Sequence, residues 1–148
     1  MASCCASGAS SAGADAETVE KMRLFGEKTG IAFQIKDDMF DFGTDDVGKP
    51  LGIDIKEKKV TLPLIYALNN TDNTTKKRMI NLVKNHNDDP EKIDAIIGFV
   101  KQTGGLTYAE TQMKKYREEA FEILKTFPAG DARTGLEQLV NFTTDRNK

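Results

Sequence analysis

Amphipathic helical patterns follow one another along most of the chain, and glycines or prolines interrupt them. The longest pattern predicts one helix over residues 15–42, in which apolar residues recur at helical intervals and which Gly43 ends. Gly26 and Gly30 lie inside it. Because glycine costs about 1 kcal/mol relative to alanine in a helix, we expect both glycines to permit close packing of another helix. Few β-branched residues alternate with polar ones, so the predicted class is all-α.

Five further helices are predicted after a loop at residues 43–52. Asp72 or Thr74 would begin one of them, and the pair Asp89–Pro90 would begin the next. Their approximate ranges are 60–70, 72–86, 90–103, 106–126 and 132–142. The first fifteen residues are small and almost uncharged, and composition leaves open a flexible tail or a tightly packed helix.

The length and charge of the chain exclude several classes of protein. With 148 residues, one sizeable core and hence one domain is expected. Its 21 basic and 23 acidic side chains alternate, which predicts neither a nucleic-acid partner nor a polybasic membrane anchor. No apolar run is long enough for a membrane span, and the first residues lack a signal-peptide pattern, so we expect a cytoplasmic protein.

Histidine and cysteine chemistry is scarce. His86 is the one histidine, and Cys4 and Cys5 are neighbours, between which a strain-free disulfide is geometrically unfavourable. A zinc site of histidine and cysteine and a histidine-based nucleophilic triad are therefore not expected.

The stretch FQIKDDMFDFGTDD concentrates acids near the end of the first long helix. Asp37, Asp38 and Asp41 are spaced to share one helix face with Gln34. Their mutual repulsion and the helix dipole both disfavour this arrangement, so a divalent cation would stabilise it. A solvated acidic face is the equally weighted alternative. The loop lacks the acids of a helix-loop-helix calcium site, so Mg²⁺ is the better candidate, and Mg²⁺ implies a phosphorylated ligand.

Lysines follow the acidic cluster within a short distance. Lys49 lies in a loop between glycines, and Lys56, Lys58 and Lys59 come soon after it. Ammonium groups beside carboxylate-bound Mg²⁺ suit a diphosphate, whose oxygens they share with the metal. Any one of these lysines could equally be a surface residue, so the inference depends on the combination.

Two stretches carry a resemblance to a known family. The segments GIAFQIKDDMFDF and GKPLGIDIKEKKVTLPLIYAL closely resemble the second aspartate-rich region of the trans-type polyprenyl diphosphate synthases, and TGGLTYAETQMKKYREEA resembles their following helices. The resemblance spans about residues 2–140 and implies a bundle of the isoprenoid synthase type. Members join isopentenyl diphosphate to an allylic diphosphate, using Mg²⁺ held by two aspartate-rich motifs, and form homodimers.

The resemblance implies a role for each matching residue. Asp37 and Asp38 would be Mg²⁺ ligands, and Asp41 would assist. Catalytic and substrate-binding roles would fall to the glutamine and lysines, with the phenylalanine lining the adjacent wall: Gln34, Lys49, Lys59 and Phe33. Lys58 stands where the family usually has glycine, which leaves open whether Lys58 or Lys59 faces the site.

The first aspartate-rich motif of the family does not occur in the sequence. We therefore expect residues 1–148 to be the C-terminal part of a single isoprenoid-synthase helical domain, and to be inactive in isolation. The alternatives are a non-catalytic helical subunit or inactive truncated product of such an enzyme, and, less favoured, a terpene cyclase, because cyclases usually carry a different second motif. The region resembles that of bacterial long-chain synthases, so we expect an octaprenyl product.

Overall fold

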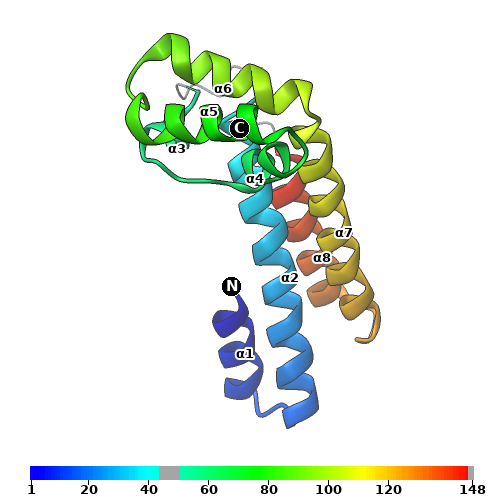
Figure 1. The fold of residues 1–148 in the computed structure, drawn as a ribbon. Helices are drawn as coiled ribbons and strands as arrows, with labels where there is room; N and C mark the ends of the chain where they lie inside the picture. The colour runs from blue at the N-terminus through cyan, green and yellow to red at the C-terminus, as the bar shows by residue number, and fades with distance from the viewer. Residues whose placement is uncertain (44–50, 147–148) are drawn as a thin grey trace. The chain divides into compact units, whose positions relative to one another are not determined.

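The computed structural model describes residues 1–43 and 51–146, and this part is built from helices without a strand (Figure 1). The predicted all-α class is confirmed. The helices, in chain order, are α1 (Ala2–Ser11), α2 (Ala16–Phe40), α3 (Ile53–Lys56), α4 (Leu62–Asn69), α5 (Asn73–Asn85), α6 (Pro90–Gln102), α7 (Gly105–Lys125) and α8 (Asp131–Asp145). None of the described helices is both long and apolar enough to cross a bilayer.

Capping side chains fix two of the helix starts that the sequence predicts. Asp72 accepts hydrogen bonds from the backbone N–H groups of Thr74 and Thr75, at 2.8 and 3.0 Å, and so begins α5. These hydrogen bonds lower the pKa of the Asp72 carboxyl. Asp89 accepts from the N–H of Glu91, and Pro90 takes the first position of α6.

The contacts divide the chain into two compact units, to which α2 and α7 both contribute. One unit comprises residues 1–34 and 112–146, with a buried core of Phe25, Ala120, Leu124 and Val140. The other comprises residues 35–111 of the described chain, where α4, α5 and α6 pack on one another. Its core is larger and includes Phe42, Ile55, Leu64, Ile96 and Val100. The predicted single domain stays a prediction.

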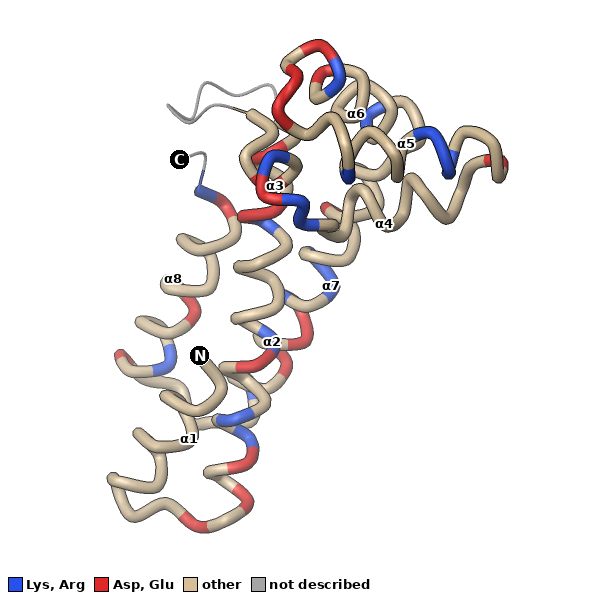
Figure 2. Tube along the Cα trace, turned by 60° about the vertical axis from the view of Figure 1, so that its left-hand side comes forward, with Lys and Arg blue, Asp and Glu red and all other residues tan. Residues whose placement is uncertain are grey.

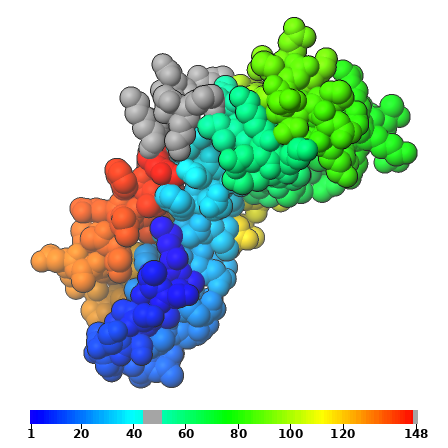
Figure 3. Space-filling view, turned by 90° about the vertical axis from the view of Figure 1, so that its left-hand side faces the viewer, coloured from blue at the N-terminus to red at the C-terminus, as the bar shows by residue number. Residues whose placement is uncertain are grey.

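In the first unit, the N-terminal residues form the helix α1, which packs against α2 and is not a flexible tail. In the space-filling view α1 lies directly against α2 (Figure 3). A Cβ atom added at Gly26 would lie 2.8 Å from Cys5 Sγ and 2.8 Å from the carbonyl oxygen of Met1. A Cβ atom at Gly30 would lie 3.4 Å from Met1 Cβ. The close packing expected at these two glycines is therefore confirmed.

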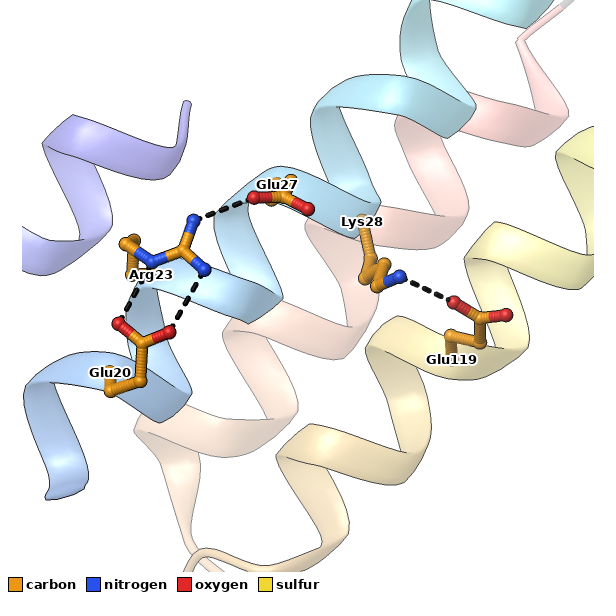
Figure 4. Close-up of polar contacts among 5 residues, drawn as sticks. All are labelled: Glu20, Arg23, Glu27, Lys28 and Glu119. Atoms are coloured by element: carbon orange, nitrogen blue, oxygen red, sulfur yellow. Dashed lines mark hydrogen bonds and ion pairs between the residues drawn. The ribbon is translucent and has the colours of Figure 1, made fainter.

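Ion pairs lie on the surface of the same unit (Figure 4). On α2, Arg23 pairs with Glu20 one turn before it and with Glu27 one turn after it, at 2.8 and 2.6 Å. Lys28 of α2 reaches Glu119 of α7 at 2.8 Å. Because solvent screens these exposed charges, the pairs contribute little to stability, and the apolar core carries most of it.

The short helix α3 was not predicted, and a left-handed residue ends it. The N–H of Lys58 bonds to the carbonyl of Ile55, and the N–H of Lys59 bonds to the carbonyl of Asp54. This is the hydrogen-bond pattern that also ends α1, where Gly13 has φ 77°. Lys58 occupies the equivalent position with φ 58°, the one non-glycine residue with positive φ among those described. Lys58 thus lies at a position whose backbone conformation favours glycine.

Gly26→Ala is expected to lower the free energy of unfolding by about 1 kcal/mol, because the new methyl group would press on the backbone of α1. Gly98→Ala in α6 is the matched control. Nothing lies within 4 Å of a Cβ atom there, so alanine should raise the free energy of unfolding by about 0.5–1 kcal/mol. Urea unfolding followed by circular dichroism measures both changes, and stabilisation at both positions would contradict the close contact of α1 with α2.

Lys58→Gly is expected to raise the free energy of unfolding by about 1 kcal/mol, since the left-handed conformation strains every residue except glycine. Part of this gain is offset by the greater freedom of glycine in the unfolded chain. Lys56→Gly, inside α3, should instead destabilise by about 0.5–1 kcal/mol. Thermal and urea unfolding of the two variants give the comparison. Destabilisation by both glycines would show that Lys58 is not strained.

Candidate functional site

The aspartate cluster lies at the C-terminal end of α2. Gln34 and Asp37 are exposed, Asp38 is half-buried, and Asp41, just past the last helical residue, is buried with 8% of its surface accessible. Helical spacing brings Gln34, Asp37 and Asp38 close together along α2, whereas Asp41 follows its last residue, so the shared face of all four residues stays a prediction. Asp37 and Asp38 are more accessible than Asp41, so these two aspartates could reach a ligand in solvent.

Asp41 holds the start of α3. Its Oδ2 atom accepts a hydrogen bond from the backbone N–H of Asp54 at 3.2 Å, and its backbone carbonyl accepts from the N–H of Gly52 at 3.1 Å. Burial raises the pKa of the Asp41 carboxyl, and this backbone hydrogen bond only partly offsets the effect. Asp41 therefore joins the end of α2 to α3, which begins twelve residues later in the sequence.

Asp54 links Asp41 to one of the predicted lysines. Lys59 Nζ lies 3.4 Å from Asp54 Oδ1 and 2.6 Å from Glu57 Oε2, and these two carboxylates raise the pKa of Lys59. Sequence reasoning missed Asp54; the only signal was an acid five residues before Lys59, in the first turn of a helix that was itself not predicted. Acidic and basic positions alternate along α3 and the segment after it (Figure 2).

The remaining predicted residues are placed as follows. Phe33 is half-buried on α2, directly before Gln34. Lys58 is exposed. Lys49 lies outside the described residues. The structure thus connects Asp41 and Lys59 through Asp54 and keeps Phe33 and Gln34 on the same helix as the aspartates, while the assignment of site roles stays a prediction.

The donor set fits part of a magnesium site. Mg²⁺ is usually held by one or two carboxylates together with substrate phosphates and water, and Asp37 and Asp38 at a helix end offer two such carboxylates. Within residues 1–43 and 51–146, no three histidine, cysteine, aspartate or glutamate side chains form a group able to hold a metal ion.

Asp41→Asn is expected to increase stability at neutral pH, because an amide oxygen can accept the Asp54 hydrogen bond without a buried charge. The raised pKa means that the folded state binds more protons than the unfolded state between the two pKa values. Wild-type stability therefore falls as pH rises through that window. The advantage of the variant should shrink below about pH 4, where the carboxyl is protonated in both states.

Urea unfolding of wild type and variant at about pH 3.5 and about pH 7 measures this difference. The other carboxylates titrate in both proteins, so their effect on stability cancels in the comparison. An advantage of equal size at both pH values would show that the buried charge of Asp41 is not its cause.

Solved structures of similar sequence share this fold over nearly the whole chain. A geranylgeranyl pyrophosphate synthase from Bacteroides thetaiotaomicron is 38% identical, with a TM-score of 0.89 over 98% of this chain and 48% of that one. A polyprenyl synthase from Caulobacter crescentus, complexed with calcium and isoprenyl diphosphate, is 29% identical, with a TM-score of 0.85 over 99% of this chain and 45% of that one.

Sequence comparison gives the same result. The heptaprenyl diphosphate synthase component 2 of Bacillus subtilis is 33% identical over 96% of this chain and 40% of its own length. The chain thus spans less than half the length of this relative and of the two solved structures. The sequence model of the family described as polyprenyl synthetase matches residues 1–100, about two thirds of the chain. The chain therefore belongs to the polyprenyl synthetase family.

Proposed function

We propose that this chain supplies the second aspartate-rich half of the active site of a polyprenyl diphosphate synthase. The observation that carries the proposal is the placement of Gln34, Asp37 and Asp38 on one accessible stretch of α2, in a chain that belongs to this family. The related C. crescentus enzyme was solved with calcium and isoprenyl diphosphate, which supports a site for a divalent cation and a diphosphate in this fold. The reaction would elongate an allylic diphosphate with isopentenyl diphosphate.

The proposed chemistry is heterolysis of the allylic C–O bond. The electron pair leaves with diphosphate, the allylic cation bonds to the double bond of isopentenyl diphosphate, and the proton then lost goes to diphosphate. Bound Mg²⁺ would supply positive charge to the leaving diphosphate. Asp37 and Asp38 are the residues that would hold it, and no histidine is needed as a base.

The other residues would act by binding and orientation. Lys49 and Lys59 would hold diphosphate oxygens that the metal leaves free, as cationic donors do for developing anions. Lys59 already forms ion pairs with Asp54 and Glu57, so a diphosphate would compete with these carboxylates for the ammonium group. Gln34 would orient the reacting ends, and Phe33 would form an apolar wall that excludes water from the cation.

Asp41 has a supporting role in this proposal. Its carboxylate is buried and accepts a hydrogen bond from Asp54, so it would fix α3 and the Lys59 segment relative to the end of α2. Contact with the metal would then run through a water molecule, if at all, as the sequence also suggests for the third aspartate of the motif. The first aspartate-rich motif would have to come from further polypeptide, and by itself the chain is expected not to turn over.

Two exposed side chains support the need for further polypeptide. On α8, Leu139 and Phe142 are 49% and 72% exposed, which is unusual for large apolar residues on neighbouring turns of one helix. A homodimer, as the family resemblance implies, or contact with the remainder of a synthase would cover such a face.

Asp37→Ala is expected to weaken the Mg²⁺-dependent binding of a non-hydrolysable allylic diphosphate by about tenfold or more, because the loss of an outer-shell partner alone typically costs this much in metal affinity. Titration calorimetry on the folded chain, with and without Mg²⁺, measures the affinity. Wild-type binding should require both the metal and the diphosphate.

Asp94→Ala removes an exposed aspartate from α6 and is the matched control, expected to bind as the wild type does. Equal affinity of the Asp37 and Asp94 variants would contradict the proposed site.

A further inference from the structure

The end of α8 packs on the stretch of α2 that carries the candidate site. The guanidinium carbon of Arg146, the residue that follows α8, lies 4.3 Å from the centre of the Phe33 ring. A guanidinium at this distance over an aromatic face forms a cation–π contact, and its planar shape also permits stacking. Figure 1 shows α8 running beside α2 and α7 in the same unit. Phe33 directly precedes Gln34, so the contact reaches a residue assigned to the substrate wall.

A second arginine holds the last turn of α8 in place. Arg117 of α7 donates from Nη1 to Asp145 Oδ1 at 2.6 Å and from Nη2 to Asn141 Oδ1 at 2.8 Å. The guanidinium of Arg117 also lies 5.6 Å from the ring centre of Phe121, and its side chain is only 24% exposed. A partly buried, doubly bonded arginine is well ordered compared with a surface ion pair. It therefore fixes Asp145, the residue directly before Arg146.

Burial inside α8 strengthens this anchoring. Thr143 and Thr144 are buried, and their hydroxyl groups both donate to the carbonyl of Val140, at 2.9 and 3.0 Å. Val140 itself is fully buried in the core of the unit. The last turn of α8 is thus held by apolar packing and by Arg117, and these contacts fix the backbone directly before Arg146.

We propose that Arg146, held by the contact of Arg117 with Asp145, is a positioning residue that fixes the Phe33 ring beside Gln34. The inference rests on the proposed function, because Phe33 matters as part of the substrate wall. A ring free to turn would sweep across the space next to Gln34 and would have to be ordered when substrate binds, at a cost in affinity. The stack orders the ring in advance.

The contact can be tested by fluorine NMR without any ligand. The chain contains eight phenylalanines, so 4-fluorophenylalanine labelling gives a small set of resonances, and Phe33→Leu identifies the one from Phe33. Arg146→Gln is expected to shift and narrow this resonance as the ring becomes mobile. Arg146→Lys, which keeps the charge but not the planar group, should restore the wild-type position only in part.

Two further variants test the ion pair of Arg117 with Asp145 and the specificity of the effect on Phe33. Asp145→Asn weakens the ion pair with Arg117 while preserving the shape of the side chain, and should move the Phe33 resonance in the same direction as Arg146→Gln. Arg23→Gln is the matched control, because Arg23 lies ten residues before Phe33 on the same helix and contacts Glu20 and Glu27 instead. It should leave the Phe33 resonance unchanged.

The functional readout is the Mg²⁺-dependent affinity for the non-hydrolysable allylic diphosphate. Arg146→Gln should weaken it by about two- to fivefold, the range that a cation–π contact supports, while circular dichroism shows that the variant stays folded. An unmoved Phe33 resonance in Arg146→Gln, or an equal movement in Arg23→Gln, would overturn the inference. The resonances are recorded without ligand, so they test the Arg146–Phe33 contact even if the chain binds no diphosphate. Failure of the proposed function would appear only in the affinity measurement.

Discussion

The hydrogen bond between the Asp41 carboxylate and the backbone of Asp54 determines how the end of α2 meets the segment after it. Without it, the first turn of the four-residue helix α3 would lose a buried partner, and so short a helix has little stability of its own. Burial of Phe42 and Ile55 in one core completes the connection. The third aspartate of the predicted motif thus holds Asp54, and through it Lys59, near the end of α2.

The two ends of the described chain meet the same helix. At Gly26, α1 approaches α2 so closely that a methyl group would not fit, and near Phe33 the end of α8 packs on α2 through Arg146. The segment of α2 that leads to the aspartates is therefore held by contacts from distant parts of the sequence. Such support is what a site needs if its carboxylates and its apolar wall are to be ordered before the ligand arrives.

Local patterns predicted most of the fold but not its connections. Caps and breakers indicated α5 and α6 closely, because Asp72 and Asp89 act on their own neighbours. Helix α3 and the role of Asp54 could not be predicted, since both depend on Asp41, which lies 13 residues before Asp54. The contact of Arg146 with Phe33 joins residues far apart in sequence and leaves no local signal. Helical spacing predicts a shared face for Gln34, Asp37, Asp38 and Asp41, but no local signal indicates that Asp41 is buried.

We propose that the chain carries one half of a prenyltransferase site and needs the other half to act. The direct measurement combines the purified chain with the remaining part of a related synthase, such as the B. subtilis heptaprenyl diphosphate synthase component 2, and follows incorporation of labelled isopentenyl diphosphate. We expect product from the mixture, none from either part alone, and none when Asp37→Ala replaces the wild-type chain. Product from this chain alone, or an equally active Asp37→Ala mixture, would contradict the proposal.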